Sequence, residues 1–143
     1  MNWDELFMGM AELVAQKSKD EGTKCGCVLV GPDNEVRSVG YNGIPRGIEY
    51  KDEYQERPEK YYWFEHAERN AVYNAARFGA PLVGCKAYVT NQLCHDCVRA
   101  LIQAGIIEII MPSKCTLNGT HWNESVERAF KMLDLANIKY RFI

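Results

Sequence analysis

One histidine and two cysteines of this 143-residue chain stand at spacings that could hold a metal ion. His66 lies in the stretch "WFEHAERNAVYNAARFG", and Cys94 and Cys97 form a Cys-x-x-Cys pair in "NQLCHDCVRA". Residues three apart on the first turn of a helix share one face, so both sulfurs could reach a single ion. Three protein ligands leave a fourth position open on zinc, which is typical of a catalytic rather than a structural site.

Glu68 stands two residues after His66, where a carboxylate can lie beside the open position without binding the metal. Zinc makes a water molecule acidic enough to lose a proton near neutral pH. Glu68 could accept that proton and pass it to a substrate nitrogen, acting first as a base and then as an acid.

Each half of this pattern also has a simpler interpretation. A lone Cys-x-x-Cys pair occurs as a redox pair in thioredoxin-like proteins, and a lone histidine on a helix is more often structural than a ligand. The redox interpretation leaves His66 and Glu68 unexplained, so the joint pattern favours the metal site. His-x-Glu followed by Pro-Cys-x-x-Cys is the signature of zinc nucleobase deaminases.

Four segments, "TKCGCVLV", "GYNGIPRG", "HAERNA" and "LCHDC", together resemble the cytidine and deoxycytidylate deaminase family, most of all its deoxycytidylate (dCMP) deaminases. The resemblance runs from the first helix to about Met111. It implies that the zinc ligands are His66, Cys94 and Cys97, with Glu68 as the proton shuttle. It also implies that Asn42 holds the sugar hydroxyl of the substrate and that the backbone around Ala67 contacts the pyrimidine ring.

The implied reaction is the zinc-dependent hydrolytic deamination of dCMP to dUMP with release of ammonia, which supplies the precursor of thymidylate. Asn70 favours the dCMP branch, because tRNA adenosine deaminases typically carry an apolar residue there. Other substrates stay open, namely cytidine, dCTP, guanine and a tRNA adenosine. A non-catalytic zinc-binding module is the alternative from another class, and Glu68 at the required spacing argues against it.

Three basic residues are candidates for binding the phosphate of a nucleotide: Arg46, Lys24 and Arg57. A solvated surface charge is the simpler explanation for each, and we favour Arg46 because it is near Asn42 in sequence. The family resemblance also implies a homo-oligomer, a hexamer or a dimer, with dCTP and dTTP as candidate effectors.

The sequence departs from the family at Leu93, where members usually have proline immediately before the first ligand cysteine. Proline would preset the backbone at this turn, whereas leucine adopts the same dihedral angles at an entropic cost. We expect His95, between the two cysteines, to be an outward surface residue, because adjacent helix positions face in different directions. Contact with substrate or with a neighbouring subunit is the alternative.

The composition argues against several classes of protein. The net charge of −2 comes without the basic stripe of a nucleic-acid-binding protein. No apolar run approaches the roughly 20 residues of a membrane span, and the N-terminus "MNWDELFMGM" lacks the basic start of a signal peptide. We therefore expect a cytoplasmic protein with a nucleotide substrate and no membrane partner, in which the six cysteines are thiols or metal ligands.

The apolar periodicity predicts one domain over residues 1–143 with the element order α-β-β-α-β-α-β-α-β. Asn2 and Glu5 form a capping box at the start of the first helix, and a functional loop is expected over 42–63. Further helices are expected at about 65–78, in "CHDCVRALIQA" and in "ESVERAFKMLDLA". The later alternation predicts a partly parallel sheet covered on both faces, and the family resemblance implies a three-layer α/β/α fold with a five-stranded mixed sheet.

Overall fold

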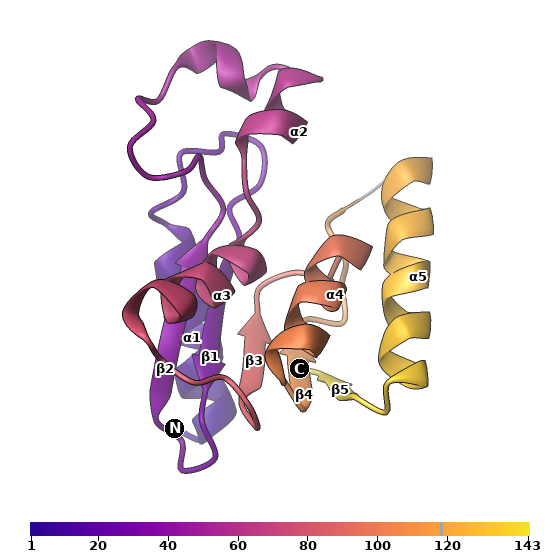
Figure 1. The fold of residues 1–143 in the computed structure, drawn as a ribbon. Coiled ribbons are helices and arrows are strands. Elements are labelled where there is room, and N and C mark those ends of the chain that lie inside the picture. Colours follow the sequence, from indigo (N-terminus) through magenta and orange to yellow (C-terminus); the bar gives the residue numbers. More distant parts are fainter. Residues whose placement is uncertain (118) are drawn as a thin grey trace.

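The structure is a computed structural model that describes residues 1–117 and 119–143. Its middle layer is a five-stranded sheet in the order β2-β1-β3-β4-β5 (Figure 1). The strands are β1 (Gly26–Val30), β2 (Val36–Tyr41), β3 (Lys86–Val89), β4 (Glu108–Met111) and β5 (Lys139–Phe142). β1 runs antiparallel to β2 and β3, whereas β3, β4 and β5 are parallel to one another. The mixed sheet expected from the sequence is confirmed.

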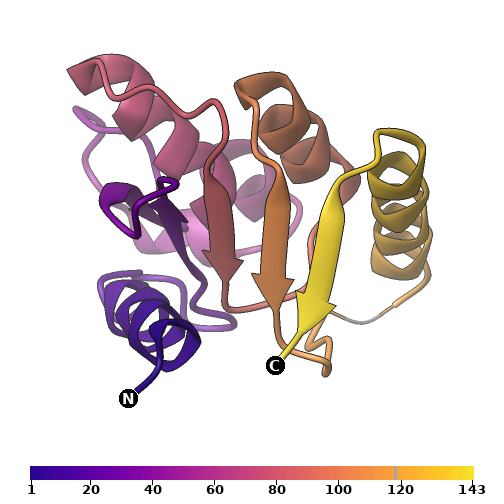
Figure 2. The same cartoon turned by 90° about the horizontal axis from the view of Figure 1, so that it is seen from below.

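Helices cover both faces of this sheet (Figure 2). α1 (Trp3–Ala15) lies on one face, and α3 (Ala67–Phe78) and α4 (His95–Ala104) lie on the other, with α5 (Thr120–Leu135) beside α4. The three-layer α/β/α fold is therefore confirmed. No helix among the described residues is both long and apolar enough to cross a bilayer.

The loop predicted over 42–63 contains two short helices that the sequence did not reveal. They are a 3-10 helix, η1 (Asp52–Gln55), and α2 (Glu59–Trp63). This segment extends beyond one end of the sheet, at the top of Figure 1. Tyr54 is buried and stacks on Trp63 with 4.3 Å between ring centroids, which packs η1 against α2.

β1 shows why the fold has two separate cores. Cys27 and Leu29 point into the core under α3 and α4, whereas Val28 and Val30 point into the core under α1. Successive side chains of a strand face opposite sides of the sheet. A strand covered on both faces therefore reads as a continuous apolar run, which is what "CVLV" is.

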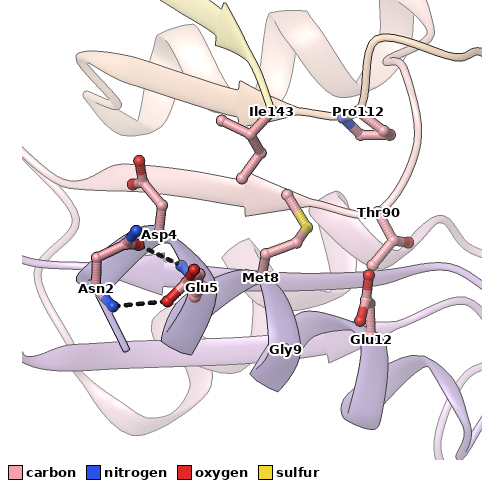
Figure 3. A pocket seen from close by; sticks show the side chains of 9 residues that line it. All are labelled: Asn2, Asp4, Glu5, Met8, Gly9, Glu12, Thr90, Pro112 and Ile143. Carbon is pink, nitrogen blue, oxygen red and sulfur yellow. Dashed lines mark hydrogen bonds between the residues drawn. The ribbon is translucent and has the colours of Figure 1, made fainter.

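The helix ends follow the predicted capping chemistry. Asn2 and Glu5 form the capping box of α1, with both side-chain-to-backbone hydrogen bonds at 2.8 Å (Figure 3). α3 and α4 end at Gly79 and Gly105, whose φ angles of 78° and 92° favour glycine. The start of the last helix was predicted wrongly, because α5 begins at Thr120 rather than near Glu124.

Gly40 allows α3 to approach β2 closely. A Cβ atom at Gly40 would lie 2.4 Å from the backbone oxygen of Ala67 and 2.4 Å from the backbone nitrogen of Ala71. Both contacts are with the first turns of α3, so the backbone rather than a movable side chain blocks the space. Glycine at this position therefore sets how deeply the start of α3 sits on the sheet.

We expect Gly40→Ala to lower the free energy of unfolding by about 1–3 kcal/mol, because α3 must shift to make room for the new methyl group. Urea unfolding measures this change. Gly43→Ala is the matched control, since its Cβ would meet nothing nearer than 3.6 Å, and we expect it to change stability by no more than about 0.5 kcal/mol. Equal stability of the two variants would contradict this account of the packing.

Candidate active site

His66, Cys94 and Cys97 come together at the N-terminal ends of α3 and α4. Their ligand atoms all lie within 4.8 Å of one another, and Nδ1 of His66 is 3.4 Å from the sulfur of each cysteine. A nitrogen and a sulfur on one tetrahedral zinc, at about 2.1 and 2.3 Å from the ion, would be about 3.5 Å apart. The three donors therefore fit a zinc ion in both type and spacing.

Two of these residues lie just before their helices and not on a first turn, where the sequence placed them. His66 and Cys94 are the N-cap residues that precede α3 and α4, and only Cys97 is on a first turn. The sulfur of Cys94 accepts a hydrogen bond from the backbone N–H of Cys97 at 3.4 Å. It thus takes the place of the oxygen that usually caps a helix, at a helix end that favours negative charge.

The charge states of the three candidate ligands differ. The pKa of Cys94 is lowered to about 3, because hydrogen bonding by Cys97 and by His66 stabilises its thiolate against the opposing effect of burial. Burial holds the pKa of Cys97 well above its ordinary value, and the neighbouring charge of Cys94 adds to this. Burial alone would lower the pKa of His66, but its hydrogen bond to the Cys94 thiolate raises it. The metal-free site therefore retains the proton of Cys97 at neutral pH, and His66 binds a proton more tightly than an ordinary imidazole does.

Glu68 lies beside this cluster and is almost fully buried. The thiol of Cys97 donates to its Oε2 atom at 3.2 Å. Burial raises the pKa of Glu68, although the charge of His66 opposes the effect. A carboxyl group with a raised pKa is suited to accept a proton and give it back near neutral pH.

An aromatic cluster that the sequence did not reveal stands next to His66. The Trp122 ring lies 6.0 Å from the His66 ring and 6.4 Å from the Tyr61 ring, between centroids. His121 is exposed, and its ring also packs against Trp122 with 5.2 Å between the ring centroids. The helical spacing of Trp122, Val126 and Ala129 was the signal that could have placed this tryptophan on α5.

Asn42, expected to hold a sugar hydroxyl, is buried and already bonded within the protein. Its oxygen accepts from the backbone N–H of Cys25 at 2.8 Å, and its amide nitrogen donates to the Thr23 carbonyl and to Asp20 at 2.9 and 3.2 Å. Only the second lone pair of the oxygen remains for a ligand. A bond to the sugar stays a prediction, and it is confined to that one acceptor.

The candidate phosphate ligand Arg46 is exposed and lines a small pocket of about 80 Å³ near Tyr41 and Asn70. None of the three candidate zinc ligands lines this pocket. Lys24 is also exposed, and Arg57 lies over the ring of Tyr61, 5.7 Å from its centroid. The structure thus brings together the predicted metal ligands and Glu68, but it does not bring the basic residues into one cluster with them.

Ala67 is fully buried and is the first residue of α3, between His66 and Glu68. A larger cavity, of about 490 Å³, lies on α1 (Figure 3). It is lined by Asn2, Asp4, Glu5, Met8, Gly9, Glu12, Thr90, Pro112 and Ile143. No predicted site residue lines this cavity. The candidate active site is therefore the cluster of His66, Cys94, Cys97 and Glu68 and not this cavity.

Comparison with known proteins identifies the class of this chain. Residues 1–113 match the family described as the cytidine and deoxycytidylate deaminase zinc-binding region. The deoxycytidylate deaminases of Mus musculus and Homo sapiens are 33% and 31% identical, each over 99% of this chain and 79% of their own length. The chain therefore belongs to the cytidine and deoxycytidylate deaminase family, a family of deaminating enzymes.

A bacterial relative and a solved structure extend the comparison. An uncharacterized deaminase encoded in the luxG 3′ region of Aliivibrio fischeri is 34% identical over 99% of this chain and 93% of its own length. The dCMP deaminase of cyanophage S-TIM5, in complex with dCMP and dUMP, has the same fold with a TM-score of 0.77 at 22% identity. That match covers 97% of this chain and 95% of the phage protein.

We expect zinc affinity to rise with pH from 6 to 8, because zinc must displace the proton that the raised pKa keeps on Cys97. The raised pKa of His66 adds proton competition at the acid end of this range. Competition with a chelator at several pH values measures this affinity. Cys97→Ser, which removes one ligand, should lose most of the affinity at every pH. A zinc affinity independent of pH would contradict the proposed charge states.

Proposed function

We propose that this protein catalyses the hydrolytic deamination of dCMP to dUMP. The observation that carries the proposal is the buried carboxyl group of Glu68 against a ligand set of one histidine and two cysteines. Identity of about one third to deoxycytidylate deaminases along nearly the whole chain supports the choice of substrate.

Nδ1 of His66 and the sulfurs of Cys94 and Cys97 are the atoms that would hold zinc. When bound, zinc supplies a water molecule whose pKa is lowered to about 7. The thiolate character of Cys94 prepares one ligand in advance.

Glu68 would carry the protons of the reaction. Its carboxylate accepts a proton from the water that adds to carbon 4 of cytosine, and it donates that proton to ring nitrogen N3. Glu68 would then transfer the proton of the new hydroxyl group on carbon 4 to the amino group, which leaves as ammonia as the carbonyl forms, so that one water and one dCMP give one dUMP and one ammonia. Burial helps Glu68 to hold the proton between these steps, since its pKa is raised.

Other residues would bind the nucleotide. The backbone around Ala67 lies between His66 and Glu68, which supports the proposed contact with the pyrimidine. The rings of Trp122 and Tyr61 offer an apolar surface beside His66 on which a base could pack. The free lone pair of Asn42 is the candidate acceptor for the sugar hydroxyl, and Arg46 is the candidate for the phosphate. A homo-oligomer, dCTP and dTTP as effectors, and a cytoplasmic location stay predictions.

We expect the zinc-loaded protein to release ammonia from dCMP but not from cytidine, dCTP, guanine or a tRNA adenosine. A panel of these substrates, assayed for ammonia and for the deaminated product, checks this expectation. Turnover of another member of the panel but not of dCMP would move the proposal to that substrate. Failure with every cytosine nucleotide would contradict the proposed reaction.

We expect Glu68→Gln to lower kcat by about 10²- to 10⁴-fold, because glutamine cannot exchange protons. Zinc content should be unchanged, since Glu68 is not one of the three clustered ligands. Glu127→Gln, on the exposed side of α5, is the control and should retain full activity. Full activity in Glu68→Gln would exclude Glu68 as the proton shuttle and favour a non-catalytic zinc module.

A further inference from the structure

His95 differs from the prediction that it is simply a surface residue. Its side chain is 35% exposed, and its Nδ1 atom is 2.6 Å from the hydroxyl oxygen of Ser125 on α5. The same oxygen accepts a hydrogen bond from the backbone N–H of His95 at 3.0 Å. One serine thus binds both the backbone and the side chain of the residue that follows Cys94.

The hydrogen-bonding capacity of Ser125 matches this double contact. A hydroxyl group has one proton to donate and two lone pairs that accept. Oγ accepts from the backbone N–H of His95, and its own proton can go to Nδ1 of the ring. The ring proton then lies on Nε2, which is 3.5 Å from Oδ1 of Asp96. Ser125 is buried, so its hydroxyl group needs partners within the protein, and His95 supplies them.

The backbone N–H of His95 would otherwise have no partner within its helix. The first N–H groups of any helix lack acceptors in the preceding turn, and His95 is the first residue of α4. Cys94 caps the N–H of Cys97 with its sulfur. Ser125 therefore completes the cap from another helix, directly beside the candidate ligand.

Two more residues of the same turn, Asn91 and Gln92, bind the segment that leads into α5. The Asn91 side chain accepts from the backbone N–H groups of Gln92 and Thr116 at 2.9 and 3.2 Å. The Gln92 side chain donates to the Ser113 carbonyl at 3.1 Å. The turn that presents Cys94 is thus attached on both sides to residues 113–125, almost all of which lie beyond the family match over residues 1–113.

Leu93 explains why this attachment matters. The zinc deaminase signature has proline before the first cysteine, and proline fixes the φ angle of that position. Leu93 is buried, but a leucine side chain does not fix the φ angle of the backbone as the proline ring does. Among the described residues, its backbone N–H donates to no partner, so a proline there would break no hydrogen bond.

We propose that Ser125 and His95 form a clamp that fixes the backbone at Cys94, and so positions its sulfur for zinc, in place of the missing proline. In this proposal Ser125 and His95 are positioning residues, because they act through Cys94 and are not among the three clustered candidate ligands. The inference rests on the zinc site of the proposed function, and it adds α5 to the parts of the chain that this site requires.

Zinc affinity of matched variants at Ser125 tests the clamp. Ser125→Thr keeps the hydroxyl, and Ser125→Val has nearly the same shape without it, so their difference reports the hydroxyl alone. We expect zinc affinity, measured by chelator competition, to be at least about 10-fold lower in the valine variant, as for other groups that orient a metal ligand. Adding Leu93→Pro to Ser125→Val should recover most of the lost affinity.

Ser38→Ala is the control for the loss of a buried serine hydroxyl group at another place in the fold. Ser38 lies in β2, and its hydroxyl group donates to the backbone carbonyl of Ala71 in α3 at 2.7 Å. This variant should leave zinc affinity unchanged. Equal affinity of the threonine and valine variants would overturn the clamp. If the wild-type protein binds zinc but does not deaminate dCMP, the proposed reaction fails, while the difference in zinc affinity between the variants still decides the clamp.

Discussion

The contact of one imidazole nitrogen with two cysteine sulfurs is the constraint on which the site depends. His66 ends an extended segment and Cys94 ends another, and each begins a helix on the same face of the sheet. Nδ1 of His66 is 3.4 Å from both sulfurs, so α3 and α4 must meet at their N-termini with an accuracy of a few tenths of an ångström. The close packing at Gly40 and the parallel pair β3 and β4 serve this one requirement.

The same helix ends also set the electrostatics. Two N-termini point at the cluster, and the imidazole is close to both sulfurs, so negative charge is stabilised there. Burial works in the opposite direction for Cys97 and Glu68, because it raises the pKa of both groups. The candidate ligand Cys94 is favoured as a thiolate, while the Glu68 carboxyl has a raised affinity for protons. This combination suits the proposed transfer of protons between water and a base.

Much of the fold and the ligand set could be predicted from the sequence, because both leave local signals. The alternation of the later helices and strands, the Asn2–Glu5 capping box and the helix ends at 78 and 104 each depend on neighbours in sequence, and they were predicted correctly. His66 and Cys94 were expected within the first turns of their helices rather than at the N-caps, since periodicity does not distinguish an N-cap from a first turn. Trp122 and Ser125 were missed as site residues because their partners, His66 and His95, are 56 and 30 positions away, and no local pattern reports such contacts. The involvement of the Asn42 amide with Asp20 and Thr23 was hidden for the same reason.

X-ray absorption at the zinc edge of the metal-loaded protein tests the central claim most directly. The account predicts two sulfur ligands at about 2.3 Å and the remaining ligands as nitrogen or oxygen at about 2.0–2.1 Å. Cys97→Ser should then show one sulfur. Four sulfur ligands, or none, would contradict the site built from His66, Cys94 and Cys97.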